Sequence, residues 1–555
     1  MHDILLNPLA VGSERERGAV YTRREVVEAI LDLVGFTVEE HLWKMTILEP
    51  CCGKGDFLIP ILERLIASYR THGGLVSEIG LALQGCVCAV EISAGSHAAV
   101  SIAVEDFLKS SGFSSGDAAM LVKAWVIHAD FLLVPLPGAF DFIVGNPPYL
   151  RQERIPDALL TEYRRRYATL YDRADIYIPF IERSLNLLRA KGMLGLICSD
   201  RWMKNRYGGP LRNMVSRGFH LKYLLSINEV PAFTEEVIAY PAIFVIENAL
   251  GNHSTRIAVP PRSLSELGDS ARQMQSAVES DTFRDMRGVV CSDEPWLTDA
   301  NAHIALIRRL EKDFPTLEEA GCRVGIGVAT GADRVFIAPY AELDVEEERK
   351  VPLIGTKDIA SGSVEWRGMG VVNPFEDDGS IAQMDRYPRF RKWIETHEII
   401  LRKRHVANRP GVAWYRTIDR IYRDLVTTPK LLIPDIKGAA NVVYEAGCYY
   451  PHHNLYYVVS SGWDLRALQA VMRSQLCHLF ITAYSLQMQG GFLRFQAQYL
   501  RRLRLPKWED VGQVMRERLV RAATVGDAVA CDMASAELFR LNDEELTTLH
   551  TFSNP

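Results

Sequence analysis

Residues 46–57 read TILEPCCGKGDF, an apolar run that ends at the acid Glu49, passes through two glycines and leads into a helical pattern over residues 56–69. Four more apolar runs follow with helical patterns between them, at residues 85–93, 124–131, 140–149 and 193–200. Strands that alternate with helices predict a mostly parallel sheet with helices on both faces. Because ligands bind such sheets at the carboxyl ends of the strands, the segment from Thr46 to Asn248 predicts an α/β domain with its site at that edge.

The chain is too long for one ordinary hydrophobic core. It has 555 residues, whereas a typical domain has roughly 100 to 200. The alternation stops near Gly251, where a polar stretch begins that is typical of a linker. We therefore expect an α/β domain over residues 1–250, a domain of mixed α+β character over 251–507 and a helical tail over 508–555.

The composition is that of a globular protein, with 48% hydrophobic and 24% charged residues. No run of about 18 apolar residues and no secretory leader is evident, so we expect a cytoplasmic protein. The ten cysteines include no CxxC pair and no zinc-like spacing to a histidine pair. This pattern predicts reduced, mostly buried thiols and no metal site.

Polar groups follow three successive predicted strands. Gly53 and Gly55 follow the first, where their small size lets the backbone approach a ligand closely. Glu91 ends the second, where a carboxylate can accept both hydroxyls of a ribose. Asp130 ends the third, where an acid can receive an adenine amino group while the ring of Phe131 packs on the base. A single acid at a strand end is as often a helix cap, but three in succession, Glu49, Glu91 and Asp130, favour a nucleoside-binding site.

The next apolar run stops at Asn146, Pro147, Pro148 and Tyr149. Two prolines fix φ and donate no backbone hydrogen bond, so they give a rigid loop whose carbonyls are free acceptors. The exocyclic amine of adenine is a poor nucleophile because its lone pair is delocalised into the ring. If the side-chain oxygen of Asn146 and the carbonyl of Pro147 accept from the amino hydrogens, the nitrogen can attack a methyl sulfonium in line. Tyr149 would stack on the extruded base. Proline pairs also end strands without any catalytic role, and the earlier motifs weigh against that interpretation.

The order of these motifs resembles the gamma class of N6-adenine amino-methyltransferases that modify DNA, the NPPY family, which includes modification enzymes of type II restriction–modification systems. Residues 18–22, GAVYT, are similar to the family's N-terminal motif, which contacts the methionine part of S-adenosyl-L-methionine. The resemblance implies a Rossmann-like S-adenosylmethionine-dependent methyltransferase domain, a C-terminal target-recognition domain and base flipping. Two positions depart from the family, because Arg23 stands where proline is usual and Lys54 where a small residue is common.

The same resemblance assigns the residues of the site. For cofactor binding it implies Thr22, Glu49, Pro50, Cys51, Gly53, Gly55, Glu91, Ile92, Asp130, Phe131, Asn146 and Pro148. For catalysis it implies Asn146, Pro147, Tyr149 and Phe233. Phe233 would be the second aromatic ring, which holds the flipped adenine against Tyr149.

Basic residues interleaved with aromatic ones gather in the second half of the chain. Between Glu398 and Lys437, nine basic residues and four acids give a local charge of +5 in a chain of net charge −6. That net charge excludes a uniformly basic coat but permits a basic cleft, although a charge run is as often only a solvated face. We predict that double-stranded DNA is bound by Arg402, Lys403, Arg404, Arg416, Arg420, Lys437 and Arg494.

Several alternatives stay open. Asn146 favours adenine, or a protein glutamine, over the N4 of cytosine, because serine or threonine is commoner at that position in cytosine enzymes of the family. The basic second half favours DNA over a glutamine side chain, and an RNA substrate is a further alternative. A non-catalytic DNA-specificity module of a defence complex is the rival from another class, and the intact Asn146 to Tyr149 motif argues against it. No nuclease motif is evident, so a cognate restriction endonuclease would be a separate protein, and we expect a monomer.

Overall fold

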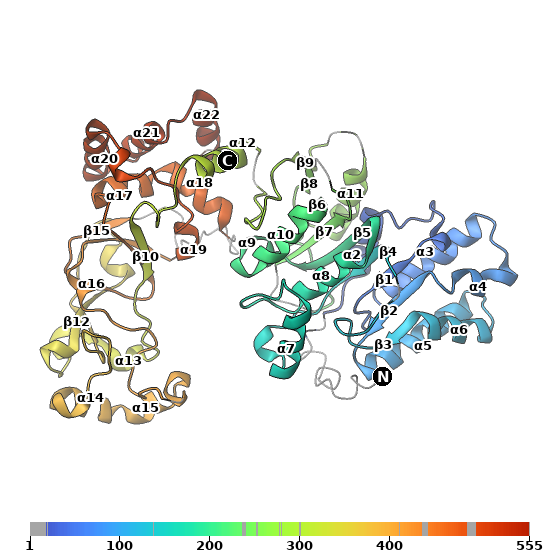
Figure 1. Ribbon diagram of the computed structural model, residues 1–555, viewed down its shortest axis with the longest axis horizontal. Coiled ribbons are helices and arrows are strands. Elements are labelled where there is room, and N and C mark those ends of the chain that lie inside the picture. Colours follow the sequence, from blue (N-terminus) through green and yellow to red (C-terminus); the bar gives the residue numbers. More distant parts are fainter. Residues whose placement is uncertain are drawn as a thin grey trace. The chain divides into compact units, whose positions relative to one another are not determined.

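The computed structural model describes residues 18, 20–136, 138–235, 240–250, 254–276, 278, 280–298, 301–409, 411–435, 442–485 and 496–553. The chain divides into two compact units, Met1–Asn301 and Ala302–Pro555 (Figure 1), and each is described by itself. No helix among these residues is both long enough and apolar enough to cross a membrane.

The first unit is built on a mixed sheet. Its described strands are β1 Ile47–Glu49, β2 Val87–Glu91, β3 Val126–His128, β4 Phe140–Gly145, β5 Leu188–Ser199, β6 His220–Ser226, β7 Pro241–Glu247, β8 Thr255–Ala258 and β9 Phe283–Met286. They lie in the order β3-β2-β1-β4-β5-β7-β6-β8-β9. Strands β1 to β5 pair in parallel, and β7 is antiparallel to both β5 and β6. The expected mostly parallel α/β sheet is therefore confirmed for the segment that carries the motifs.

Helices connect and cover these strands. The first unit contains α2 Arg24–Val34, α3 Leu58–Thr71, α4 Ile79–Leu83, α5 Ala94–Ser110, α6 Ser115–Trp125, α7 Asp157–Arg166, α8 Tyr177–Asn186, α9 Arg201–Lys204, α10 Gly209–Gly218 and α11 Leu264–Gln275. Every residue of β1 and β2 is buried, which is the pattern of strands covered on both faces. Helices α2 and α8 both pack on β5. Gly195 allows the close approach of α2, because a Cβ there would lie 2.4 Å from Val34.

The strand order reverses between β1 and β4. Strand β1 pairs with β2 on one side and with β4 on the other, so the connections that follow these two strands leave in opposite directions. A crevice forms at the carboxyl ends of two strands at such a reversal. The glycine loop follows β1 and the Asn146 loop follows β4, so both motifs lie at this crevice.

The second unit contains two small sheets. One has the order β10-β17-β14-β15, and the other has the order β11-β13-β12-β16. The strands are β10 Cys322–Ile326, β11 Ile337–Pro339, β12 Lys350–Ile354, β13 Met369–Val372, β14 Lys430–Pro434, β15 Val443–Glu445, β16 Tyr450–Pro451 and β17 Leu455–Ser460. The helices are α12 Asn301–Asp313, α13 Asp333–Phe336, α14 Pro388–Thr396, α15 Glu398–Arg402, α16 Asp424–Thr427, α17 Leu465–Arg473, α18 Gln475–Tyr484, α19 Ala497–Leu500, α20 Gln513–Val525, α21 Ala528–Leu538 and α22 Asp543–Ser553. This is the mixed α+β character expected of the C-terminal half.

The boundary between the units lies further along the chain than the expected position near residue 250. Strand β8 pairs in parallel with β6, β9 pairs with β8, and α11 packs on α2, so residues 254–286 extend the first unit. The tail packs within the second unit, with α20 and α21 against α17. Strands β8 and β9 have only four residues each and lie in a polar stretch, so they show no clear alternation of apolar residues. The composition of this stretch therefore suggested a linker.

Candidate active site

A cavity with about 950 Å³ of space, part of it open to solvent, lies at the carboxyl ends of β1, β2 and β4. It brings together nearly all of the residues predicted to bind the cofactor: Thr22, Glu49, Pro50, Cys51, Gly53, Glu91, Ile92, Asp130, Phe131, Asn146 and Pro148. Four other predicted residues are not among those that line it: Gly55, Pro147, Tyr149 and Phe233.

The glycine loop fixes the carboxylate of Glu91. Gly53 and Gly55 have φ of 51° and 101°, in the region that residues with a side chain rarely adopt. This turn aims the N–H of Gly53 at Oε2 of Glu91, 2.9 Å away, while Oε1 accepts from the N–H of Ser93 at 2.7 Å. Gly55 packs behind the loop, where a Cβ would lie 3.1 Å from Val100. The carboxylate is thus held in a fixed orientation in the lining of the cavity.

Three carboxylates crowd this part of the cavity. Glu49 is 2% exposed, and its Oε2 has no hydrogen-bond partner among the described residues. Burial, with the negative charges of Asp56 and Glu91 beside it, raises the pKa of Glu49 well above its ordinary value. Burial also raises the pKa of Asp56. A ligand with positive charges relieves such a cluster, and S-adenosyl-L-methionine carries a sulfonium and an ammonium group. The residues present fit this cofactor.

Asp56 is a site residue that the motifs did not single out. Its Oδ2 accepts the backbone N–H of Thr22 at 2.9 Å, so it joins the glycine loop to the GAVYT segment. An acid directly after the second glycine was the available signal in the sequence.

Asp130 has more partners within the fold than expected. Its Oδ1 accepts from the N–H of Leu132 at 2.8 Å, and its Oδ2 accepts from the hydroxyl of Tyr163 at 2.6 Å. Tyr163 itself lines the cavity, and no local sequence pattern indicated it. Phe131 is buried, with its ring 5.0 Å from that of Phe180. The pair Asp130 and Phe131 thus forms one wall of the cavity.

The side chain of Asn146 has one possible orientation. Its Nδ2 donates to the carbonyl of Val20 at 3.0 Å and to the hydroxyl of Thr22 at 3.1 Å. A backbone carbonyl only accepts, so the amide nitrogen must face Val20. The amide oxygen, Oδ1, is therefore the free end, buried and without a hydrogen-bond partner among the described residues. The main-chain carbonyl of Asn146 accepts from the thiol of Cys51 at 3.1 Å, which braces the loop from the cofactor side.

Tyr149 and Phe233 lie together in the structure. Their ring centroids are 6.1 Å apart with the planes at 78°, so the rings meet edge to face. The ring of Tyr177 lies 6.4 Å from Tyr149 on another side. The hydroxyl of Tyr149 is buried without a partner among the described residues, and burial raises its pKa. A base that stacks between Tyr149 and Phe233 would require one ring to turn.

The GAVYT segment contacts the Asn146 loop through the backbone. The N–H of Tyr149 donates to the carbonyl of Gly18 at 2.9 Å. Gly18 has φ of 72°, and a Cβ there would come within 2.5 Å of the main chain of Tyr149. Glycine at this position is therefore required for the contact, both by its backbone conformation and by the lack of space.

The structure accommodates both departures from the family pattern. The N–H of Arg23 donates to the carbonyl of Ala232, and its Nε donates to the carbonyl of Phe233, each at 3.0 Å. Proline at this position could make neither bond. The ammonium of Lys54 lies 4.6 Å from the centroid of the Tyr21 ring. Arg23 thus fastens the segment that carries Phe233, a role that sequence reasoning did not assign to it.

The residues predicted to bind DNA have very different surroundings in the second unit. Arg404 donates to the carbonyls of Thr330 at 3.1 Å and Trp414 at 2.8 Å. Arg416 and Arg420 also donate to main-chain carbonyls nearby. These three guanidinium groups therefore stabilise the fold of this unit.

Fewer basic side chains are exposed and unpaired than the nine basic residues between Glu398 and Lys437 suggest. Arg402 pairs with Glu398 and lies 4.3 Å from the ring of Trp414. Lys403 is exposed, and within the described residues its side chain makes no hydrogen bond or ion pair. The same holds for Arg409, which lines a hollow with Arg404 and Arg416. Lys437 and Arg494 lie outside the described residues.

A Rossmann-like sheet with this cavity at its switch point defines a class of protein, the S-adenosylmethionine-dependent methyltransferases. A comparison of whole structures supports the fold. The type IIL restriction–modification enzyme MmeI, solved in complex with DNA, matches with a TM-score of 0.61 at 11% identity, over 98% of this chain and 80% of that chain. At this identity the likeness shows the fold.

Sequence comparisons place the chain within this class. Residues 104–233 match the model of the Eco57I restriction-modification methylase family. The type II methyltransferase M.PaeR7I of Pseudomonas aeruginosa is 50% identical over 97% of this chain and 94% of its own length. The type II methyltransferase M.XhoI of Xanthomonas vasicola is 49% identical over 96% of this chain and 98% of its own. The chain therefore belongs to the type II DNA methyltransferases of restriction–modification systems.

Proposed function

We propose that this DNA methyltransferase transfers the methyl group of S-adenosyl-L-methionine to the exocyclic N6 of an adenine that is flipped out of the duplex. The observation that carries the proposal is the orientation of Asn146. Its Oδ1 is a buried acceptor with no partner among the described residues, because Val20 and Thr22 hold the other end of the amide. A buried acceptor without a donor is costly, and an amino group supplies the missing donor.

A second acceptor stands beside the first in the sequence. The carbonyl of Pro147 receives no hydrogen bond from the described residues. Two acceptors can take the two amino hydrogens of adenine and localise the lone pair on N6. When bound, S-adenosyl-L-methionine would supply an electrophilic methyl group, and the electrons of its carbon–sulfur bond would stay on sulfur as a neutral thioether. N6 gains the methyl group and releases one proton to solvent.

Tyr149 and Phe233 suit the holding of a flipped base. Their ring centroids are 6.1 Å apart. Arg23 fastens the backbone at Phe233, because its Nε donates to the carbonyl of Phe233. Aromatic side chains that stack on an extruded base offset part of the cost of unstacking it from the duplex. We propose that Phe233 swings out of its edge contact when the base enters.

The test is product analysis. Purified protein is incubated with tritiated S-adenosyl-L-methionine and mixed-sequence duplex DNA, and the DNA is then digested to nucleosides. Label in N6-methyladenine is the expected result. Label in N4-methylcytosine would replace the adenine assignment, and DNA binding without any label would favour a specificity module.

A further inference from the structure

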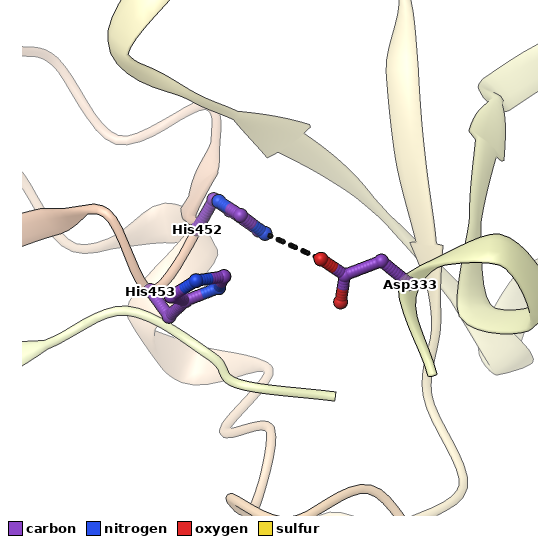
Figure 2. Close-up of side chains that lie close together, drawn as sticks. All are labelled: Asp333, His452 and His453. Atoms are coloured by element: carbon purple, nitrogen blue, oxygen red, sulfur yellow. Dashed lines mark ion pairs between the residues drawn. The ribbon is translucent and has the colours of Figure 1, made fainter. Parts of the chain in front are cut away.

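Three side chains that can ligate a metal converge in the second unit (Figure 2). Asp333 is the first residue of α13, and His452 and His453 lie between β16 and β17. Their ligand atoms all lie within 4.8 Å of one another. Nε2 of His452 is 3.5 Å from Oδ2 of Asp333, and the two imidazole ring centroids are 4.0 Å apart.

The backbone holds these residues together. The N–H of Val328 donates to the carbonyl of Pro451 at 2.9 Å, and the N–H of His453 donates to the carbonyl of Val328 at 3.1 Å. Gly327 allows this approach, because a Cβ there would lie 2.2 Å from the carbonyl oxygen of His452. The loop that leads to Asp333 is therefore fastened to the turn that carries both histidines.

The Asp333 carboxylate is also oriented. Its Oδ1 accepts from the hydroxyl of Thr330, which leaves Oδ2 directed toward the histidines (Figure 2). An Asp–His ion pair needs only one imidazole. The second ring, that of His453, makes no hydrogen bond with other described residues, yet it lies against the pair. Asp333 and His453 are exposed, so the group is open to solvent on one side.

We propose that Asp333, His452 and His453 bind one divalent transition-metal ion of the zinc type. Two imidazole nitrogens and a carboxylate oxygen are the ligands of three-residue zinc sites whose fourth position is open, whereas calcium and magnesium prefer oxygen alone. Bonds of about 2.0 to 2.2 Å put tetrahedral ligand atoms roughly 3.4 Å apart. The separation of 3.5 Å between His452 and Asp333 already matches that spacing. A small rotation of the exposed His453 ring completes the set.

The bound ion would clamp the loop before α13 to the turn before β17. This loop also supplies the carbonyl of Thr330 to Arg404, so the clamp adjoins the hollow that Arg409 and Arg416 line. The site escaped the sequence patterns because Asp333 and the two histidines lie far apart in the chain.

The experiment uses the full chain without an affinity tag, freed of metal with EDTA. Zn²⁺ is titrated by calorimetry, and Co²⁺ by visible absorption, which reports the geometry and the kind of ligand. We expect one ion per chain, with a cobalt spectrum of nitrogen and oxygen ligands and no thiolate band. Saturating Zn²⁺ should also raise the melting temperature.

Three variants test the ligands individually. Asp333→Asn keeps the acceptor for Thr330 and removes the charge, while His452→Ala and His453→Ala each remove one imidazole. Each should weaken metal binding by about tenfold or more. His550→Ala removes an exposed histidine of α22 and is the matched control. Unchanged binding in all three ligand variants, or a thiolate spectrum, would overturn the proposal. Circular dichroism and cofactor binding establish that the variants are folded.

Discussion

The direction of a single amide decides what Asn146 can do. Val20 and Thr22 lie more than a hundred positions earlier in the chain, yet they occupy both hydrogens of Nδ2. The consequence is an acceptor, Oδ1, that faces no donor in the described protein. The role proposed for Asn146 thus depends on the GAVYT segment as much as on residues 146–149.

Replacing Asn146 with alanine should lower the rate of methyl transfer by about 10² to 10³, the usual cost of losing one preorganised polar group. Cofactor affinity should stay close to that of the wild type, because Glu91 and the glycine loop are untouched. Single-turnover methylation and calorimetric binding measure the two quantities. Asn186→Ala, an exposed asparagine at the end of α8, is the control.

Two variants of Thr22 test the hydrogen bond from Nδ2 of Asn146 to the Thr22 hydroxyl. Thr22→Ser keeps the hydroxyl that accepts from Asn146, and Thr22→Val removes it at nearly constant volume. The valine variant should lose rate while the serine variant keeps most of it. Equal rates in the two variants would show that Val20 alone orients the amide.

Glu49 should make cofactor binding depend on pH. Its pKa is raised in the folded chain, so it contributes stability below the unfolded pKa, and that contribution is lost as pH rises through the folded pKa. A cationic cofactor favours the ionised form, so binding should release a proton and tighten as pH rises. Calorimetry in two buffers of different ionisation enthalpy measures this release. Glu49→Gln should abolish it, whereas Glu25→Gln, on the exposed face of α2, should not.

At the level of elements, the segment before α2 connects separate parts of the site. Thr22 donates its N–H to Asp56 of the glycine loop, and Arg23 binds the carbonyls of Ala232 and Phe233. The cofactor loop, the catalytic loop and the Phe233 segment therefore meet at one short stretch of chain. None of these three loops belongs to a helix or strand, so the hydrogen bonds to this stretch add to the contacts that hold them in place.

Two substitutions at Arg23 separate its two hydrogen bonds. Arg23→Ala removes only the side-chain bond, while Arg23→Pro removes the backbone N–H as well. Proline suits the backbone there, because Arg23 has φ of −65°. We expect alanine to lower the free energy of unfolding by about 1 kcal/mol and proline by about 2 kcal/mol. Urea denaturation measures both, and equal losses would mean that the bond to Ala232 contributes nothing.

At the level of the whole molecule, the cofactor cavity and the basic cluster belong to different units. The first contains the cofactor cavity and the Asn146 loop, and the second contains the basic cluster. In that cluster Arg404, Arg416 and Arg420 use hydrogen-bond donors on carbonyls of their own fold. Arg402 pairs with Glu398, whereas the exposed side chains of Lys403 and Arg409 make no hydrogen bond or ion pair within the described residues. We therefore assign phosphate contacts to these two first.

Lys403→Ala and Arg409→Ala should each weaken DNA binding and lower the slope of log K against log salt by about 1. Arg404→Ala is the matched comparison, because it should lower thermal stability and leave that slope unchanged. Fluorescence anisotropy with a labelled duplex over a range of salt concentrations measures the slopes. A loss of slope only in the Arg404 variant would contradict this assignment.

Local patterns were enough to predict much of this protein. Alternating apolar runs indicated the α/β sheet, and the order of Gly53, Glu91, Asp130 and Asn146 at successive strand ends indicated the site. Such features are readable because each depends on residues near one another in the chain. The carboxyl ends of parallel strands then meet at one edge whatever the details of packing.

Tertiary structure alone decided the remaining features. The hydrogen bond between Asn146 and Thr22 forms only in the folded chain, as does the bond from Arg404 to the carbonyl of Thr330. The same is true of the cluster of Asp333 with His452 and His453. Tertiary structure also made residues 254–286 the edge of the first sheet. The partners in these contacts lie far apart in sequence, and their pairing depends on how whole elements pack. Composition gives the number of charges in a segment, but only packing determines which charged side chains remain available to contact DNA phosphates.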